Sequence, residues 1–317
     1  MAQDHVYDLA ILGGGPGGLT AAVYASRKQL DVVMITGDIG GQTNLTQDIE
    51  NYMGFRFISG QELADKFREQ VEQFPIKIML GKLAEGVQQE GKLFRIAVSG
   101  KEEVVARTVI IATGKRSRTL GVPGEKELVG RGVSFCSICD GPFFRDQRVA
   151  VVGGGNSGIT AVIDLLKVAR EITVLEITDT WRADPVLLER ARASEKVRWL
   201  AGHRVVRIEG TEEVTGIVVT PTAGGPEELI KLEGVFLEIG LQPNTGFLKG
   251  FVELNEYGEV VIDSRCRTSI PGVLAAGDVT NTPEKQIIVA AGEGAKAALG
   301  VYQYLLGVED VRQLQTW

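Results

Sequence analysis

Short apolar runs that lead directly into glycine-rich turns mark the first part of the chain. Residues 7–12 form such a run, and the six residues 13–18 that follow include five glycines. The next segment, 19–28, has the pattern of a helix, and residues 31–35 form another apolar run. Short apolar runs of this length are typical of strands buried in a parallel sheet. The pattern predicts a strand–turn–helix–strand unit.

The same pattern occurs again near the middle of the chain. An apolar run at 148–152 is followed by a glycine-rich turn at 153–158, a helix-like segment at 159–169 and a further apolar run at 171–175. Both turns fit G-x-G-x-x-G, the arrangement that lets backbone N–H groups approach a pyrophosphate at the start of a helix. One such match is weak evidence, but two in the same context predict two dinucleotide sites. The alternative is a pair of structural glycine turns without ligands.

Two later runs return the chain to the first unit. Residues 104–112 are predicted to be a strand that leads into Thr113 and Gly114, and residues 272–276 to be another that leads into Gly277 and Asp278. A helix is predicted for 286–306. We therefore expect an α/β fold with two Rossmann-like domains of three layers (ββα), the second inserted in the first. The predicted boundaries are 1–115 with 246–317 for the first domain and 116–245 for the second.

Composition narrows the function classes. The 317 residues are 44% hydrophobic and 24% charged, with a formal charge of −7, which does not suit a broad nucleic-acid surface. Residues 9–26 carry no charge, but they include five glycines and a proline, and no basic segment precedes them. We expect a cytoplasmic protein with neither a nucleic-acid nor a membrane partner.

The three cysteines suggest redox chemistry. Cys136 and Cys139 form one close pair, and Cys266 stands alone in a strand-like stretch, 260–268. This is not the pattern of a secreted disulfide framework, and it suits one pair that cycles in a reducing compartment, with Cys266 as a structural thiol. Half of a zinc site is a poor alternative, because the only two histidines are His5 and His203 and there is no second Cys pair, so no metal is expected. Two buried structural thiols are the other alternative.

Taken together, these motifs resemble the low-molecular-weight thioredoxin reductases, and more closely still the reductase portion of the flavoprotein subunit of alkyl hydroperoxide reductase. The resemblance covers essentially the whole chain. It includes Cys-Ser-Ile-Cys-Asp-Gly-Pro at 136–142, Ile-Gly-Leu-Gln-Pro-Asn at 239–244 and Lys-Gln-Ile-Ile at 285–288. The Cys pair precedes the second glycine loop, as in this class, whereas lipoamide and glutathione reductases carry the pair shortly after the first loop.

The resemblance implies two cofactor sites. The residues implied to bind FAD are Gly13, Gly15, Pro16, Gly18, Thr36, Gly41, Gln42, Asn51, Thr113, Gly114, Gly277, Asp278, Gln286 and Ile287. The residues implied to bind the nicotinamide nucleotide are Gly153, Gly155, Asn156, Ser157, Gly158, Glu176 and Gly240. The resemblance also implies a homodimer and a rotation of the inserted domain.

The Cys pair is implied to be the redox centre. A dithiol at a helix start can have one thiol of lowered pKa, and it can reduce a partner disulfide through a mixed disulfide. By resemblance, Asp140 would give or take a proton near the thiols; the alternative is an ordinary helix N-cap. The chain begins six residues before its first strand. We therefore expect the acceptor to be a separate protein, thioredoxin or a glutaredoxin-like carrier.

The segment after the second unit's second strand bears on the electron donor. NADPH-dependent thioredoxin reductases have His-Arg-Arg there, but this chain has Glu176, Ile177 and Thr178, and only Arg182 remains beyond them. Loss of two guanidinium groups and gain of a carboxylate disfavour a 2′-phosphate by several kcal/mol, taking about 1.5–3 kcal/mol for each charged hydrogen bond. The sequence therefore predicts NADH as the donor.

Two alternatives are compatible with the sequence. One keeps the fold but takes electrons from ferredoxin or another protein, although the intact second glycine loop favours a nucleotide. The other is a flavin- or nucleotide-binding sensor without catalysis, which the intact Cys pair disfavours. The terminal Trp317 is either a stacking residue over a flavin or at a dimer interface, or a loosely packed end.

Overall fold

The computed structural model describes residues 5–46 and 48–308. The chain divides into two compact units. The first comprises residues 1–44, 52–116 and 242–317, and the second comprises residues 45–51 and 117–241. The division therefore places the segment 45–51, which contains Asn51, with the second unit, whereas the sequence pattern groups it with the first. Trp317, for which a stacking role is one expectation, lies outside the described residues.

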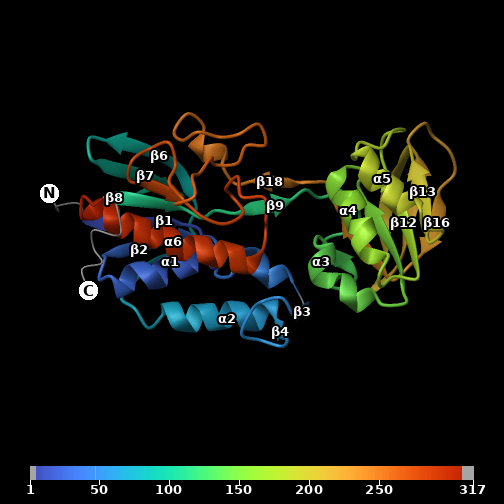
Figure 1. The fold of residues 1–317 in the computed structure, drawn as a ribbon, viewed down its shortest axis with the longest axis horizontal. Helices are drawn as coiled ribbons and strands as arrows, with labels where there is room; N and C mark the ends of the chain where they lie inside the picture. Colours follow the sequence, from blue (N-terminus) through green and yellow to red (C-terminus); the bar gives the residue numbers. More distant parts are fainter. Residues whose placement is uncertain (1–4, 47, 309–317) are drawn as a thin grey trace. The chain divides into compact units, whose positions relative to one another are not determined.

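The first unit is built on a seven-stranded sheet with the order β5-β2-β1-β8-β7-β6, in which β19 also pairs with β8. Strands β1, β2, β6, β7 and β8 of this sheet are labelled in Figure 1. Its parallel strands are β1 (Val6–Leu12), β2 (Val32–Thr36), β5 (Lys77–Leu80), β8 (Glu102–Ile111) and β19 (Val273–Ala275). Strands β6 (Ala84–Glu90) and β7 (Leu93–Val98) pair in antiparallel fashion next to β8. The helices are α1 (Pro16–Arg27), α2 (Gly60–Val71) and α6 (Ile287–Leu305), and the short elements are η1 (Gly41–Leu45), β4 (Ile58–Ser59) and η3 (Gly246–Leu248).

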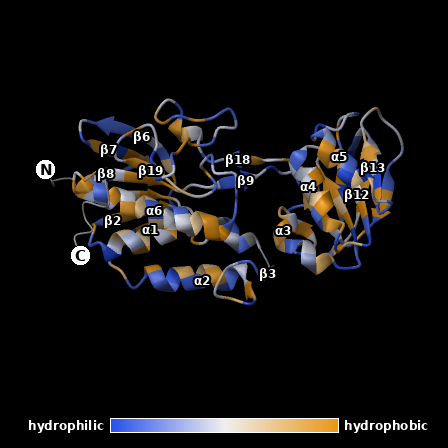
Figure 2. Cartoon of the chain, in the orientation of Figure 1, coloured by the Kyte–Doolittle hydropathy of each residue, from blue (hydrophilic) through white to orange (hydrophobic). Residues whose placement is uncertain are grey.

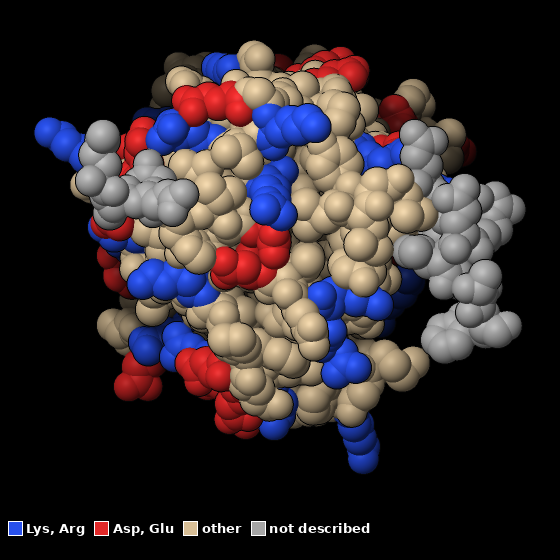
Figure 3. Space-filling view, turned by 90° about the vertical axis from the view of Figure 1, so that its left-hand side faces the viewer, with Lys and Arg blue, Asp and Glu red and all other residues tan. Residues whose placement is uncertain are grey.

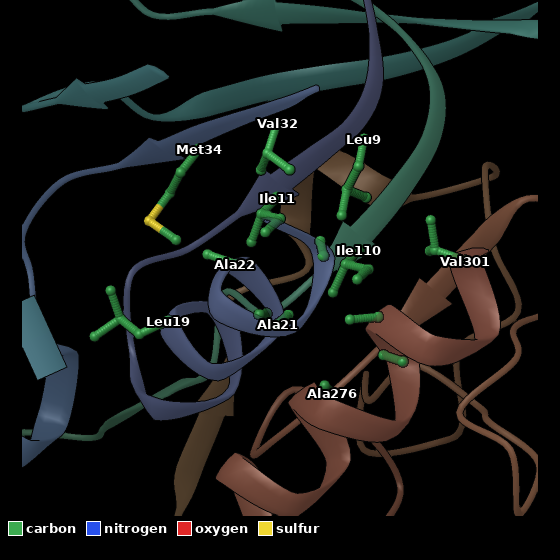
Figure 4. Close-up of a cluster of buried hydrophobic side chains, with 14 of the residues drawn as sticks. Leu9, Ile11, Leu19, Ala21, Ala22, Val32, Met34, Ile110, Ala276 and Val301 are labelled. Carbon is green, nitrogen blue, oxygen red and sulfur yellow. The ribbon is translucent and has the colours of Figure 1, made fainter. Parts of the chain in front are cut away.

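The parallel strands are buried on both faces, which explains why they read as apolar runs. One face, with Leu9, Ile11 and Ile110, packs against α1 and α6 (Figure 4). The other face, with Ala10 and Leu12, packs against the β6–β7 pair and the loops after η3. Helix α2, in contrast, mixes hydrophilic and hydrophobic residues along its length (Figure 2), as expected for a helix with one solvent face.

The second unit repeats this plan. Its sheet has the order β10-β17-β11-β12-β13, and every pair in it is parallel. The strands are β10 (Val133–Ser134), β11 (Arg148–Val152), β12 (Glu171–Glu176), β13 (Val197–Ala201) and β17 (Gly234–Leu237). One face carries α4 (Asn156–Leu165) and α5 (Pro185–Arg192), and the other an antiparallel layer of β14 (His203–Gly210), β15 (Val214–Pro221) and β16 (Glu228–Lys231). The short elements β3 (Asp48–Ile49), α3 (Ser137–Asp140) and η2 (Gly141–Phe144) belong to this unit.

Apart from the short segment 45–51, the chain enters the second unit after residue 116 and leaves it after residue 241, and the two segments at these points pair with each other. They are β9 (Lys115–Ser117) and β18 (Leu241–Pro243), which form a two-stranded sheet. The predicted α/β class with two Rossmann-like units, the second inserted in the first, is confirmed. Each unit has three layers, because helices cover one face of its parallel strands and antiparallel strands pack on the other. In the first unit these antiparallel strands, β6 and β7, are hydrogen-bonded to β8 and so continue the same sheet.

One expected strand is wrong. The stretch 260–268 contains isolated bridges at Val260 and Arg267 but no strand, and Cys266 lies in a turn with φ of +63°. The Asp263 side chain accepts hydrogen bonds from the N–H groups of Arg265 and Arg267, which favours a turn over a ladder. The Cys266 thiol is buried, and burial, with a contribution from Glu293, raises its pKa to about 12. Such a thiol is a poor nucleophile.

The contact between α1 and α6 depends on small residues. A Cβ added to Gly294 would lie far closer than 3.0 Å to the carbonyl oxygen of Gly17, whereas one added to Gly292 on the same helix would meet nothing within 4 Å. We expect Gly294→Ala to destabilise the protein by about 2 kcal/mol, the scale of an overpacked core, which a lowered thermal midpoint would show. Gly292→Ala is the matched control, and helix propensity predicts a gain of about 0.5–1 kcal/mol for it. Equal midpoints for the two variants would contradict this packing.

Candidate functional site

The two glycine loops correspond position by position. Gly13 and Gly153 each begin a loop with positive φ, +111° and +127°. A Cβ on Gly13 would run into the carbonyl oxygen of Ala112, at the end of β8, and a Cβ on Gly153 would run into that of Glu238, just after β17. Only glycine therefore allows the turn in either unit.

The last glycine of each motif brings the helix against its own loop. A Cβ on Gly18 would collide with the carbonyl oxygen of Gly13, and one on Gly158 with that of Gly153. Between them, Gly15 and Gly155 face open space, with nothing within 4 Å of an added Cβ. Both are helix N-caps, and neither α1 nor α4 has a side-chain cap. The first N–H groups of both helices are thus placed as a dinucleotide pyrophosphate requires, and the residues fit that group.

The loops differ at the middle glycine. Gly14 packs on Thr36, whose hydroxyl donates to the Asp38 carbonyl at 2.6 Å. Gly154 packs on Glu176 and Trp181. Because Thr36 ends β2 and Glu176 ends β12, the first unit has a neutral side chain where the second has an acid.

Glu176 is held tightly by its own unit. Its side chain is only 2% exposed, and it accepts hydrogen bonds from the Gly154 N–H at 2.7 Å and from the N–H and hydroxyl of Thr178, each at 3.1 Å. The Arg182 guanidinium lies 3.6 Å away. Burial alone would raise the pKa of Glu176, but these hydrogen bonds and Arg182 together lower it. The carboxylate is therefore charged at neutral pH and partly neutralises the one arginine of this segment.

The other residues expected at the second loop are also engaged within the second unit. Asn156 and Asp184 exchange two hydrogen bonds, of 3.0 and 2.7 Å, which join the starts of α4 and α5. The Ser157 hydroxyl donates to the Glu238 carboxyl. Gly240 has φ of +102° and accepts from the Arg118 N–H at 3.0 Å, so it lies at the crossing segments rather than on the loop itself.

Most of the residues expected to bind FAD surround the first loop. A Cβ on Gly41 would touch the Cα of Gly15 at 3.3 Å, and the side-chain amide of Gln42 donates to the Lys115 carbonyl. The remaining expected positions of the first unit lie at strand and helix ends: Pro16 begins α1, Thr113 and Gly114 follow β8, Gly277 and Asp278 follow β19, and Gln286 and Ile287 begin α6. Asn51 is the exception, since its segment belongs to the second unit.

A buried charge cluster next to these residues was not predicted. The Lys115 ammonium pairs with Glu259, and Lys285 lies 3.3 Å from the same carboxylate; Lys115 is 8% exposed. Burial raises the pKa of Asp278, which both lysines oppose, and lowers that of Lys285. Glu293, in an alanine-rich part of α6, accepts from the Gly277 N–H at 2.7 Å. In the sequence, the only indication of this cluster was Glu293, a charged residue among the alanines of α6.

Cys136 and Cys139 form a disulfide at the start of α3. Cys136 is the N-cap, and the Cys139 N–H donates to its sulfur at 3.2 Å. The Ser134 hydroxyl accepts from the Cys136 N–H at 3.0 Å and lies 2.6 Å from Asp140 Oδ2, to which it donates. Although Asp140 is the N-cap of η2, its side chain makes no capping hydrogen bond there. The structure thus connects Asp140 to the redox pair through Ser134, a residue that the sequence did not single out.

The family model for pyridine nucleotide-disulphide oxidoreductases matches residues 7–294. The chain belongs to this family. Its members use FAD and a pyridine nucleotide, and this chain is a flavoprotein disulfide oxidoreductase of the thioredoxin reductase-like kind.

Several relatives are similar over nearly the whole chain. Alkyl hydroperoxide reductase subunits from Staphylococcus aureus and Pseudomonas putida are 41% and 42% identical over 300 and 305 residues, 95% of this chain in each case. The chain spans only 59% of the length of these two proteins. Among solved structures, thioredoxin reductase from Streptococcus pyogenes has a TM-score of 0.91 at 40% identity, and the alignment covers 96% of this chain and 100% of that one. Thioredoxin reductase from Giardia duodenalis has a TM-score of 0.89 at 31% identity, with the same coverage.

Three further features of the described residues concern metal binding, membrane spans and surface charge. Within 5–46 and 48–308, no group of three or more His, Cys, Asp or Glu side chains is arranged to hold a metal ion. No helix in these ranges is long and apolar enough to cross a membrane. On the face shown in Figure 3, Lys and Arg side chains lie among Asp and Glu side chains.

The second loop offers a test in which two neighbouring glycines behave differently. We expect Gly153→Ala to lower the thermal midpoint of the oxidoreductase strongly, because its φ is positive and its Cβ would overlap the Glu238 carbonyl oxygen. Gly155→Ala should leave the midpoint nearly unchanged, since its φ is −87° and its Cβ meets nothing. Calorimetry of both variants measures this difference. A large loss of stability in Gly155→Ala would contradict the open space beside Gly155.

Proposed function

We propose that this oxidoreductase passes electrons from NADH through FAD to the Cys136–Cys139 disulfide, and from there to a thioredoxin-like protein. The observation that carries the choice of NADH is the buried Glu176 carboxylate at the end of β12. Its negative charge repels a 2′-phosphate, and positions 177 and 178, which are Ile and Thr, offer no guanidinium group to bind one. Arg182, the remaining cation, already pairs with Glu176.

We assign a cofactor to each loop from the residue that ends the second strand of its unit. The first loop, with neutral Thr36, would hold FAD, together with Gln42, Gly277 and Asp278 from the same unit. The second loop, with Gly155 open and Glu176 beside it, would hold the nicotinamide nucleotide. Bound FAD would supply the chemistry that links a two-electron hydride donor to a disulfide acceptor.

The chain's own thiols would complete the reaction. Two electrons and two protons convert the Cys136–Cys139 disulfide into a dithiol. A thiolate of this pair then attacks the acceptor's disulfide, forms a mixed disulfide and releases one acceptor thiol. Attack by the second cysteine re-forms the Cys136–Cys139 bond and releases the second acceptor thiol. Asp140, reached through Ser134, would hold a proton for the leaving thiolate.

The acceptor and the assembly are also proposals. Two of the solved relatives are thioredoxin reductases, which supports thioredoxin or a glutaredoxin-like protein as the acceptor. The similarity to alkyl hydroperoxide reductase subunits supports a peroxide-reducing system as the setting, although the chain spans only part of their length. We further propose a cytoplasmic homodimer in which the inserted unit rotates on the paired segments β9 and β18.

The donor can be tested by anaerobic titration of the flavin absorbance. We expect NADH to bleach the flavin rapidly and NADPH to do so at least about tenfold less efficiently, the effect of about 1.4 kcal/mol at the 2′-phosphate position. Restoring the fork with Ile177→Arg and Thr178→Arg should raise the efficiency with NADPH by at least about tenfold. Bleaching by neither nucleotide would point to ferredoxin or another protein as the donor. A native preference for NADPH would overturn the role given to Glu176.

The thiol mechanism predicts a clear result for Cys139→Ser. This variant should keep its flavin and still be reduced by the donor, but lose turnover with thioredoxin by a factor of about 10³ or more, because the disulfide cannot form. Cys266→Ser is the matched control, since its thiol is buried in the core of the first unit, whereas the pair belongs to the second, and it should retain turnover. Steady-state thioredoxin reduction measures both. Unchanged turnover in Cys139→Ser would contradict the proposed thiol mechanism.

A further inference from the structure

Besides the middle glycine, the two glycine loops differ at a second pair of positions. Ala112 closes the first loop: its N–H donates to the Leu12 carbonyl at 2.8 Å, and its own carbonyl faces Gly13. Glu238 has the same backbone role in the second unit, with its N–H 2.8 Å from the Val152 carbonyl. The structure therefore places a carboxyl side chain beside the second loop, where the first loop has only a methyl group.

This carboxyl joins the starts of two helices. The Ser157 hydroxyl, in the first turn of α4, donates to Glu238 Oε2, and the backbone of Ser137, at the start of α3, lies close enough to the carboxyl to lower its pKa. The first loop has Gly17 at the position of Ser157, so the hydroxyl and the carboxyl occur together in one loop and are both missing from the other. All three residues belong to the second unit.

A permanent charge at this position would oppose the ligand of the loop. The start of α4 is where the pyrophosphate of a dinucleotide would lie, and a carboxylate beside it repels both phosphates. Glu238 is half-buried, and the partial loss of solvent raises the pKa of its carboxyl to about 7; the hydrogen bond from Ser157 and the Ser137 backbone lower this pKa, and the nearby Asp164 raises it. Asp164, on α4, is the charged group that faces Glu238, while the cysteines of α3 do not titrate as a disulfide. Glu238 therefore changes charge close to neutral pH.

We propose that Glu238 is a positioning residue of the nucleotide site that accommodates the dinucleotide pyrophosphate in its protonated form, so that nucleotide binding takes up a proton. The inference rests on the proposed role of the second loop as the nicotinamide-nucleotide site. A neutral carboxyl keeps the hydrogen bond to Ser157 without repelling the phosphates. The carboxylate form keeps that hydrogen bond but repels them.

The sign of the pH dependence follows from this difference. Below pH 7 Glu238 is mostly protonated, and the nucleotide binds with its full affinity. As the pH rises through 7, the unliganded protein loses this proton and the apparent affinity falls. Because the liganded form holds the proton more tightly, binding near the midpoint takes up about half a proton.

The test is calorimetric titration of the oxidised, flavin-loaded protein with ADP-ribose, which carries the pyrophosphate but cannot reduce the flavin. Between pH 6 and pH 8 we expect the Kd of the native protein to rise by about tenfold. Repeating the titration in buffers of different ionisation enthalpy measures the proton uptake directly. A Kd that is independent of pH, with no proton uptake, overturns the inference and leaves the proposed function intact. No binding at any pH overturns both.

Three variants test whether Glu238, and not another titrating group, causes the pH dependence of ADP-ribose binding. Glu238→Gln should bind ADP-ribose with a pH-independent Kd close to the native value at pH 6, and without proton uptake. Asp164→Asn should move the midpoint of the native profile to lower pH, because it removes the charge that raises the pKa of Glu238. Glu195→Gln, at an exposed position of the same unit, is the matched control and should reproduce the native profile. If Glu238→Gln fails to fold, the Asp164→Asn profile decides, and an unshifted midpoint overturns the inference.

Discussion

The structure depends on one close backbone contact that is made twice. In each unit, the carbonyl oxygen at the end of a central strand lies against the first glycine of the loop, and the carbonyl of that glycine lies against the last glycine of the motif. No side chain fits at either point. The contact fixes the direction in which the following helix leaves the sheet, and it leaves the first N–H groups of that helix facing open space.

Around this common frame, the two units differ in charge. At the end of the second strand the first unit has Thr36 and the second has Glu176; at the end of the strand on the other side of the loop the first has Ala112 and the second has Glu238. The second glycine loop is therefore flanked by two carboxyl groups, those of Glu176 and Glu238. Hydrogen bonds and Arg182 lower the pKa of Glu176, whereas burial raises that of Glu238. One acid is thus a fixed charge and the other a group that titrates near neutral pH.

The second unit also holds the Cys136–Cys139 disulfide and the second glycine loop, each with its own hydrogen-bonded polar groups. Ser134 connects the Cys136 backbone to Asp140, and Glu238 connects the start of α3 to the first turn of α4. The first unit has its own buried framework, in which Lys115, Glu259 and Lys285 surround the strand ends. In both units, these polar side chains lie at the ends of strands and helices and hydrogen-bond or ion-pair with one another, so the candidate site residues do not depend on long loops for their positions.

The sequence by itself determined the repeated strand–turn–helix units, the nested order of the domains and the two cysteines that form a disulfide. These follow from local constraints: apolar runs that suit buried parallel strands, and glycines at spacings that only a tight turn requires. It also identified Glu176, because that residue directly ends a predicted strand. It failed at 260–268, where a turn held by Asp263 follows the apolar residues, since periodicity does not register side-chain hydrogen bonds to the backbone.

Only the tertiary structure decided the contacts of Glu238, Ser134, Lys115 and Glu259. In the sequence Glu238 is one acid at the end of an apolar run, and its partners Ser137 and Ser157 lie about 80 to 100 residues away. Whether such a carboxyl is charged depends on its burial and on the donors that long-range folding places around it. Local sequence sets the direction of strands and turns, but the electrostatic state of a half-buried carboxyl such as that of Glu238 is set by contacts between segments that are not neighbours in the sequence.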